Sequence, residues 1–234
     1  MSKGKLAKFS ELETYSHVMQ PQFDEVFNKD YRLKGKWKQE FFKNDHSITL
    51  ELACGKGEYA VGMAQVYPGR NFLGIDIKGA RLWTGAKRAI ENNLDNVGFL
   101  RTRIDFINSF FIEDEIDEIW ITFPDPQLRK PLKRLTSSRF LNRYKRILKP
   151  GATINLKTDS VELYEYTKKV IEINKFPLLQ DLDDIYNSSY ANDPILSIKT
   201  YYEKGWLEDG LKSHYLKFQI DNTKEIIEPP EEDG

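Results

Sequence analysis

The clearest signal of the fold is SITLELACGKGEYAVGMAQVY, residues 47–67. Its first part, 47–53, has the apolar pattern of a buried strand, and its last part, 58–67, has the pattern of a helix. The two are joined by a turn of small residues, in which Gly55 and Gly57 let the backbone bend sharply and approach a ligand closely. We therefore expect a strand–turn–helix unit with a binding site at the carboxyl end of its strand.

The alternation of strands and helices continues along the chain and indicates the fold class. It is typical of an α/β protein, in which helices cover both faces of a mostly parallel central sheet. Residues 195–220 have the pattern of two strands around a polar loop, which suits an antiparallel C-terminal edge of that sheet. Further strands are predicted at 71–77, 97–104, 118–123 and 152–158, and helices at 80–93, 137–148 and 160–175, the last with a serine or aspartate cap.

The composition bounds the class of protein. The chain has 234 residues, 40% hydrophobic and 30% charged, which suits one globular domain with extensions. No apolar run approaches the roughly 20 residues of a membrane span, and the basic N-terminus lacks the apolar segment of a secretory signal. A single cysteine excludes a disulfide within the chain, and with three histidines it argues against a zinc site. We therefore expect a cytoplasmic protein that uses neither a membrane nor a metal.

Charge is distributed unevenly along the chain, although the net charge is only −1. Residues 1–45 are polar and lysine-rich, and we expect a basic, partly mobile arm with some helix before a domain that spans 46–222. An acidic tail, 223–234, follows that domain. Residues 127–150 contain nine lysines or arginines and no acid, which fits either a phosphate-binding surface or a solvated helix face.

Three acidic residues lie at the ends of successive predicted strands. Glu51 precedes the glycine turn, Asp76 lies 25 residues further on, and Asp105 ends the following strand. An acid in the second position can accept hydrogen bonds from both ribose hydroxyls of a nucleoside, and one in the third can accept from an adenine amino group. Either aspartate alone could equally cap a helix. Because the carboxyl ends of parallel strands share one edge, the three acids together predict a cofactor that contains a nucleoside.

The turn itself indicates which cofactor is bound. A dinucleotide site typically carries a Gly-x-Gly-x-x-Gly motif around its pyrophosphate, whereas the turn here runs ACGKG from Ala53 to Gly57. Glu51 beside this turn would repel a pyrophosphate and attract the cationic ammonium and sulfonium groups of S-adenosyl-L-methionine. The expected chemistry is therefore methyl transfer.

The segment FPDPQLRK, residues 123–130, follows the fourth strand of the predicted domain and lies across the cofactor from the glycine turn. Amino-methyltransferases often place an Asp, Asn or Ser, two prolines and an aromatic residue there to hold the target nitrogen. In this chain Asp125 lies between two prolines, which limit its backbone freedom, and basic residues follow. We expect these basic residues to contact phosphates, which set affinity and register.

Several motifs, in order, resemble the bacterial type of the tRNA (guanine-N7-)-methyltransferase family. They are LELACGKGEY, FLGIDIKG, FPDPQLRK, RLTSSRFLNRYKRILKPG, LKTD and TYYEKG, and the resemblance covers Leu50 to about Phe218. It implies a Rossmann-like class I methyltransferase fold. It also implies transfer of a methyl group from S-adenosyl-L-methionine to N7 of the guanosine at position 46, in the tRNA variable loop.

The resemblance also implies which residues form the site, and Asp125 matches the active-site acid of the family. Cofactor contacts carried over by motif are Glu51, Asp76, Asp105 and Asp125, to which the close backbone approach at Gly55 is added. Substrate contacts would come from Arg129, Asp159, Thr200, Tyr201, Tyr202 and Glu203.

One departure from the family pattern concerns the base. Gln127 stands where the family usually has a tryptophan after Phe-Pro-Asp-Pro. The aromatic side chain that would wall the guanine is therefore missing, or it is supplied by Phe123, Tyr201 or Tyr202. Arg129 stands where the family usually has a lysine, which keeps the charge but alters the geometry.

The chemistry suits this set of residues. Guanine N7 carries a lone pair and no proton, so methylation requires alignment and exclusion of water rather than a general base. An ionised acid can accept from guanine N1–H and its amino group, and Asp125, Asp159 and Glu203 are candidates for that contact. Asp159 could instead cap the following helix, and 200–203 could be an exposed edge strand.

Two other functions stay open on the sequence. The chain could be a methyltransferase that acts on a small molecule or a protein, whose activity would be insensitive to salt because it would not depend on phosphate contacts. It could also be a non-catalytic RNA-binding protein with the same fold. The sequence leaves the oligomeric state, monomer or homodimer, undecided.

Overall fold

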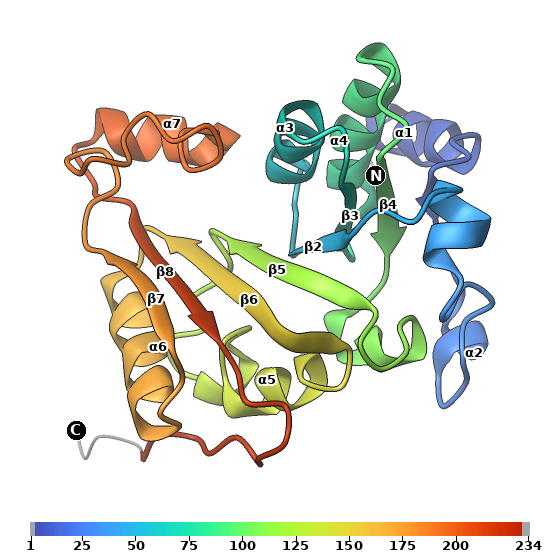
Figure 1. Cartoon of the computed structure of the whole chain (residues 1–234). Helices are drawn as coiled ribbons and strands as arrows, with labels where there is room; N and C mark the ends of the chain where they lie inside the picture. The colour runs from blue at the N-terminus through green and yellow to red at the C-terminus, as the bar shows by residue number, and fades with distance from the viewer. Residues whose placement is uncertain (1–2, 231–234) are drawn as a thin grey trace.

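The computed structural model describes residues 3–230 and contains one eight-stranded sheet (Figure 1). The strand order is β1-β4-β3-β2-β5-β6-β8-β7. The strands are β1 (Val18–Met19), β2 (Ile48–Leu52), β3 (Asn71–Asp76), β4 (Val97–Arg101), β5 (Ile116–Thr122), β6 (Leu148–Thr158), β7 (Leu178–Leu182) and β8 (His214–Gln219). The pairs from β1 to β6 are parallel, whereas β8 is antiparallel to both of its neighbours. The predicted α/β class with an antiparallel C-terminal strand is confirmed.

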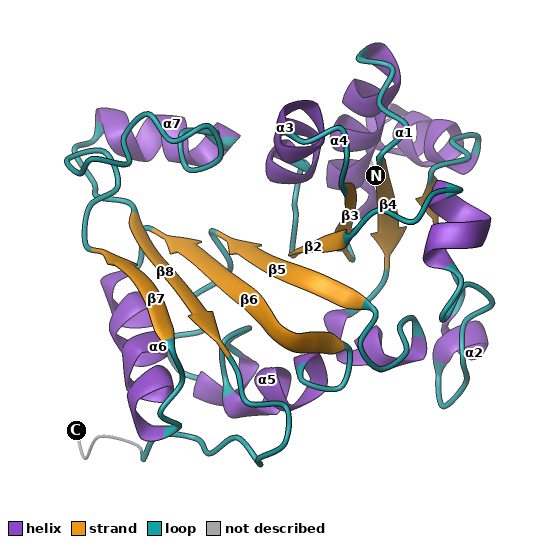
Figure 2. Cartoon of the chain, viewed as in Figure 1, coloured by secondary structure: helices purple, strands orange, loops and turns teal. Residues whose placement is uncertain are grey.

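Helices cover both faces of the sheet (Figure 2). The α-helices are α1 (Lys3–Glu13), α2 (Phe23–Val26), α3 (Glu58–Val66), α4 (Gly79–Glu91), α5 (Ser138–Tyr144), α6 (Val161–Ile173) and α7 (Tyr201–Glu208), with shorter helical segments at Trp37–Phe42, Ile104–Ser109 and Pro131–Lys133. Phe72 and Phe99 belong to one buried cluster, and their neighbours Leu73 and Leu100 belong to another. Since successive side chains of a strand point to opposite faces, these clusters form a core on each side.

The strand order reverses at β2, in the middle of the sheet. Strands β3, β4 and β1 lie to one side of β2, and β5 and β6 lie to the other. In open α/β sheets, ligands bind outside the carboxyl ends of the strands at such a reversal. The topology therefore places the turn after β2 and the loop after β5 at the same candidate site.

The C-terminal region differs from the prediction of two strands around a loop. Only β8 forms there, and the segment before it is α7. The Thr200 hydroxyl accepts a hydrogen bond from the Glu203 N–H at 3.2 Å, and the Glu203 carboxylate accepts one from the Thr200 N–H at 3.3 Å. This capping box starts a helix, so the interpretation of 200–203 as an edge strand is wrong.

Three smaller differences concern element boundaries. The helix predicted at 137–148 ends at Tyr144, and the chain enters β6 at Leu148, which pairs with β5. Helix α6 is capped by Ser160, whose hydroxyl accepts from the Leu163 N–H at 3.2 Å, so the alternative in which Asp159 caps it is wrong. The strand β7, which the pattern did not predict, pairs with β8.

The two terminal segments pack against the domain, whose proposed boundaries at 46 and 222 stay predictions. In the segment expected as an arm, Leu12 and Trp37 are completely buried, and the Trp37 indole N–H donates to the Phe110 carbonyl at 2.8 Å. In the C-terminal segment, Ile226 is buried, and the Glu228 carboxylate accepts from the Ser138 N–H at 2.9 Å. Residues 1–2 and 231–234 lie outside the described residues.

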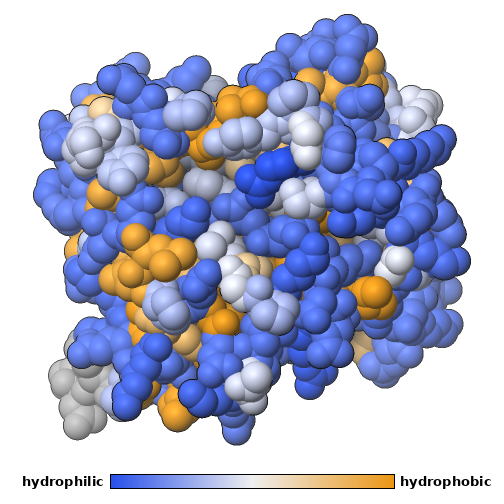
Figure 3. Space-filling view, viewed as in Figure 1, coloured by the Kyte–Doolittle hydropathy of each residue, from blue (hydrophilic) through white to orange (hydrophobic). Residues whose placement is uncertain are grey.

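Within residues 3–230, no helix is both long enough and apolar enough to cross a membrane. The face of the molecule in Figure 3 is mostly hydrophilic, and its apolar side chains lie in separate patches.

The packing of the N-terminal segment predicts its contribution to stability. Replacing Trp37 with alanine removes a fully buried side chain, and we expect the free energy of unfolding to fall by about 3–5 kcal/mol, as measured by urea denaturation. The matched control is Leu6→Ala, which truncates a half-exposed side chain of the same segment and should change that free energy by about 0.5 kcal/mol. Equal effects of the two variants would show that the segment does not contribute to the core.

Candidate active site

The turn after β2 is shaped to admit a ligand. Ala53, Gly55 and Gly57 all have left-handed backbone conformations, with φ of +56°, +57° and +68°. A Cβ at Gly57 would lie 2.6 Å from the Phe99 ring, so only glycine fits there, whereas a Cβ at Gly55 would meet no atom within 4 Å. Gly57 therefore serves packing, and the backbone at Gly55 borders open space in which a cofactor can lie.

Asp76, at the end of β3, holds this turn. Its carboxylate accepts from the Gly55 N–H at 2.9 Å and from the Lys78 N–H at 2.7 Å, and the residue is only 8% exposed. The N-cap position of α4 is Lys78, so the alternative in which Asp76 caps that helix is wrong. A carboxylate has about four acceptor sites, so Asp76 can still accept from ribose hydroxyls while it fixes the turn.

Glu51 lies behind the turn and is almost completely buried. One carboxylate oxygen accepts from the Ala60 N–H at 2.8 Å, and the other accepts from the Thr122 hydroxyl at 2.9 Å. Burial raises the pKa of Glu51 to about 8, although these two hydrogen bonds oppose the shift. The residue therefore joins α3 to β5, and its predicted contact with a cationic cofactor stays a prediction.

Asp105 was expected at the end of its strand, but β4 ends at Arg101 and Asp105 lies beyond it in the helical segment Ile104–Ser109, where it already has charged partners. Its carboxylate pairs with the Arg139 guanidinium at 2.6 Å and with that of Arg103 at 3.2 Å. These pairs, rather than a helix cap, account for its local contacts. The predicted hydrogen bond to an adenine amino group would use the acceptor capacity that remains, and it stays a prediction.

The Phe-Pro-Asp-Pro loop after β5 is bounded by two unusual backbone conformations. Phe123 and Gln127 both have φ of +47°, a left-handed geometry that is uncommon for residues other than glycine. Asp125 is exposed between them, and its carboxylate accepts from the Gln127 N–H at 3.0 Å. The loop is therefore a rigid turn that presents the Asp125 carboxylate at the carboxyl end of β5.

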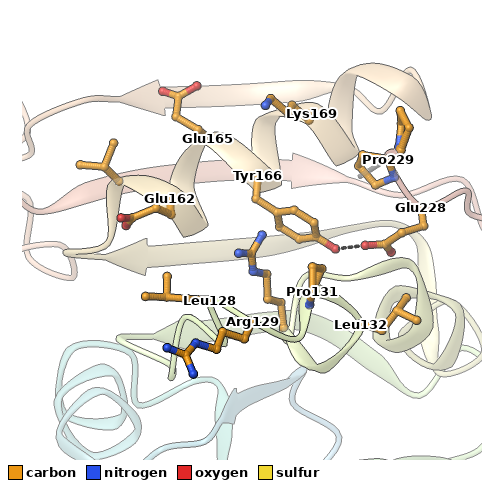
Figure 4. A pocket seen from close by; sticks show the side chains of 13 residues that line it. Leu128, Arg129, Pro131, Leu132, Glu162, Glu165, Tyr166, Lys169, Glu228 and Pro229 are labelled. Atoms are coloured by element: carbon orange, nitrogen blue, oxygen red, sulfur yellow. Dashed lines mark hydrogen bonds between the residues drawn. The ribbon is translucent and has the colours of Figure 1, made fainter. Parts of the chain in front are cut away.

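Arg129 borders a different hollow of the surface. It helps to line a groove of about 830 Å³ between the segment 128–134, helix α6 and the C-terminal segment (Figure 4). Tyr166 and Glu228 meet at the centre of this groove, where the tyrosine hydroxyl donates to the carboxylate. No residue of the glycine turn lines it, so the groove is distinct from the cofactor edge. The exposed guanidinium of Arg129 remains available to a phosphate.

Lys157 and Glu203 form a buried ion pair that the sequence analysis missed. Their side chains are both 0% exposed, and the ammonium lies 2.6 Å from the carboxylate. The ammonium also donates to the Leu196 carbonyl at 2.8 Å, while burial lowers the pKa of Lys157 to about 8 against the opposing effect of Glu203. Glu203 also accepts from the Tyr186 hydroxyl at 2.7 Å. In this structure Glu203 positions α7, and its predicted contact with the base edge stays a prediction.

The N-terminal end of α7 lies against the glycine turn after β2, here also called the cofactor turn. The Lys56 ammonium lies 3.4 Å from the centre of the Tyr201 ring, and the Tyr201 N–H donates to the Glu58 carboxylate at 3.2 Å. Arg81, in the first turn of α4, lies 5.7 Å from the centre of the Tyr202 ring. The structure thus brings Thr200, Tyr201 and Tyr202 to the predicted site, although on a helix.

Asp159 lies just after β6 at the same edge. It is half-buried, and burial raises the pKa of its carboxyl.

Within residues 3–230, no three His, Cys, Asp or Glu side chains gather as a metal site. Of the missed features, α7 had a signal in the sequence, since Thr200-x-x-Glu203 is a capping-box motif. Lys157 had none, because nothing in a strand pattern shows a buried ammonium.

Comparison with known proteins identifies the family. A family model described as "Putative methyltransferase" matches residues 45–216. A tRNA (guanine-N(7)-)-methyltransferase of Bacteroides thetaiotaomicron is 48% identical over 229 residues, which cover 98% of this chain and 90% of that protein. A protein of the same name from Christiangramia forsetii is 47% identical over 94% of this chain and 99% of its own length.

Solved structures agree on the fold. The chain is similar to the 16S rRNA methyltransferase KamB, with a TM-score of 0.60 and 15% identity over 80% of this chain and 93% of that one. It is also similar to the 16S rRNA (adenine(1408)-N(1))-methyltransferase from Catenulisporales acidiphilia, with a TM-score of 0.57 and 14% identity over 84% and 98% of the two chains. At these identities the likeness concerns the fold alone. The length and identity of the sequence matches show that the chain belongs to the bacterial tRNA (guanine-N(7)-)-methyltransferase family.

Proposed function

We propose that this chain transfers a methyl group from S-adenosyl-L-methionine to N7 of the guanine at position 46 of tRNA, giving 7-methylguanosine, in the cytoplasm. The observation that carries the proposal is the position of Asp125. It is exposed on a rigid turn at the carboxyl end of β5. Strand β5 pairs with β2, whose glycine turn borders open space at Gly55. The chain shares 48% identity with a relative named for this reaction.

The residues present fit the cofactor. The open space at Gly55 leaves room for it, while Asp76 offers acceptors to ribose hydroxyls and Glu51 lies behind the turn, where a cationic group would favour its ionised form. When bound, S-adenosyl-L-methionine supplies the methyl group, which guanine N7 takes with its lone pair while the carbon–sulfur bonding electrons stay on sulfur, so the positive charge passes to the purine.

The chain contributes alignment and electrostatic stabilisation to this reaction. Asp125 can accept from guanine N1–H and its amino group, which selects guanine over adenine, and its negative charge stabilises the purine as it becomes cationic. Asp159, half-buried just after β6 at the same edge, is the second candidate for this contact. The exposed Arg129 and Lys130, next to the loop, would neutralise tRNA phosphates and set the register of the tRNA.

The direct test is a methyl-transfer assay with nucleoside analysis. The purified chain is incubated with labelled S-adenosyl-L-methionine and an unmodified tRNA transcript, which is then digested to nucleosides. We expect label in 7-methylguanosine, and none from a control transcript in which adenosine replaces the guanosine at position 46. Label in another nucleoside, or in the control transcript, would contradict the proposed target.

The role of Asp125 predicts a loss of rate. We expect Asp125→Asn to lower kcat by roughly 100- to 1,000-fold. The amide cannot accept both hydrogen bonds from the guanine edge as a carboxylate does, and it carries no negative charge to stabilise the cationic purine. Asp114→Asn serves as the matched control, since Asp114 is an exposed acid before β5, remote from its carboxyl end, and asparagine tolerates its positive φ. Steady-state kinetics with tRNA measure both. Full activity of Asp125→Asn would remove the residue from the mechanism.

The burial of Glu51 predicts a pH-dependent stability. Its pKa of about 8 in the folded protein lies above the value of 4.5 for an unperturbed glutamate. Because burial disfavours the ionised carboxylate, the contribution of Glu51 to the free energy of unfolding is complete below about pH 4.5. This contribution falls as the pH rises to about 8, by at most about 5 kcal/mol.

Glu51→Gln tests this dependence, because glutamine does not titrate. We expect the free energy of unfolding of the wild type, from urea denaturation, to fall relative to that of Glu51→Gln between pH 5 and pH 8. Parallel curves for the two proteins across this range would contradict the raised pKa.

A further inference from the structure

Helix α7 presents a row of aromatic side chains to the loop that contains Asp125. The Trp206 ring lies 5.4 Å from the Phe123 ring, between centroids, and 6.0 Å from the Tyr202 ring, with which it is nearly parallel. We infer that Trp206, together with Phe123, forms the wall against which the target purine of the RNA stacks. This inference rests on the proposed function, and it assigns to α7 the aromatic contact that Gln127 does not provide.

The position of α7 supports the inference. Its N-terminal residue is fixed on the cofactor turn by Lys56 and Glu58, and Tyr202 lies near Arg81 of α4. Its later turn reaches Phe123, two residues before Asp125. Figure 1 shows α7 standing away from the sheet, on the side where β5 and β6 end. The aromatic row therefore extends from the cofactor turn to the active-site loop.

Trp206 suits the contact better than the other aromatic residues of the row. Tyr201 and Tyr202 already lie near the cationic groups of Lys56 and Arg81. Trp206 is only partly buried, so its indole is not a core side chain. Alanine substitutions show that stacking of a base on such a ring contributes about 1–3 kcal/mol.

Phe123 makes this wall rigid. Its left-handed backbone is fixed by a hydrogen bond from its N–H to the Lys157 carbonyl at 2.8 Å, and the Lys157 ammonium lies 5.4 Å from the centre of its ring. Because the same ammonium pairs with Glu203 of α7, one residue sets both sides of the aromatic pair. A backbone conformation that costs energy persists only where the surroundings enforce it, and such residues cluster at functional sites.

The indole also suits the charge that develops during the reaction. The purine becomes cationic as N7 is methylated, and an indole face attracts a cation more strongly than a phenyl or phenol ring does. The interaction is therefore stronger in the transition state than with the neutral base. An interaction of that kind raises kcat rather than only lowering KM.

The test compares Trp206→Ala with Trp206→Phe in tRNA kinetics at saturating S-adenosyl-L-methionine. We expect Trp206→Ala to lower kcat/KM by roughly 5- to 150-fold, with a fall in kcat, and Trp206→Phe to lose less. Cofactor affinity, measured by calorimetry, should stay within about twofold of the wild type. Adding Gln127→Trp to Trp206→Ala should restore part of the rate, since it puts an indole on the loop itself.

A second readout does not depend on turnover. Trp37 and Trp120 are buried, and Trp83 is partly exposed on α4, so Trp83→Phe leaves Trp206 as the one partly exposed tryptophan within residues 3–230. We expect 7-methylguanosine 5′-monophosphate to quench the fluorescence of this variant, and the quenching to disappear when Trp206→Phe is added. The matched control on the same helix is Glu208→Ala, an exposed residue, which should leave kinetics and quenching unchanged.

The outcomes separate this inference from the proposed function. If the wild type methylates no tRNA, the proposed function fails and the inference fails with it. If the wild type makes 7-methylguanosine and Trp206→Ala does so at the same rate, the inference alone is overturned. It is also overturned if Trp206→Ala loses cofactor affinity as much as tRNA activity, because Trp206 would then only hold α7 in place.

Discussion

The buried ion pair between Lys157 and Glu203 is the interaction on which the geometry of the site depends. Both charges have left water completely, and the desolvation of each costs several kcal/mol. The pair is tolerated because the ammonium also donates to the Leu196 carbonyl and the carboxylate accepts from the Tyr186 hydroxyl. The Lys157 carbonyl in turn accepts from the Phe123 N–H. One strand residue thereby fixes both helix α7 and the loop that presents the Asp125 carboxylate.

The acids Asp76 and Glu51 have structural roles at the candidate site. Asp76 shapes the glycine turn through two backbone N–H groups, and Glu51 joins α3 to β5 through its two hydrogen bonds. A site built in this way is already organised before a ligand arrives, because its shape is set by groups that the ligand would also contact. Preorganisation of this kind lowers the ordering cost of binding.

The family pattern and this structure place the aromatic contact differently. Gln127 lacks the ring usual at its position, while α7 brings Trp206 to within 5.4 Å of Phe123. A flat base can stack on any aromatic ring that lies beside the acid holding its edge. The ring can therefore come from a different element of the chain. The position of α7 therefore compensates for a departure that the loop alone would leave unexplained.

The α/β class, the glycine turn after β2, the acids Glu51 and Asp76 near strand ends and the family were predictable from the sequence, because apolar periodicity and short motifs are local features of the chain. The sequence could also have shown α7, whose capping box in Thr200 to Glu203 was outweighed by the strand-like pattern around it. Only the tertiary structure decided that Glu203 is buried against Lys157, that Asp105 is paired with Arg139, and that Trp206 meets Phe123. Each of these contacts joins residues far apart in the chain, and the distance between two such residues depends on how the helices and loops pack on the sheet.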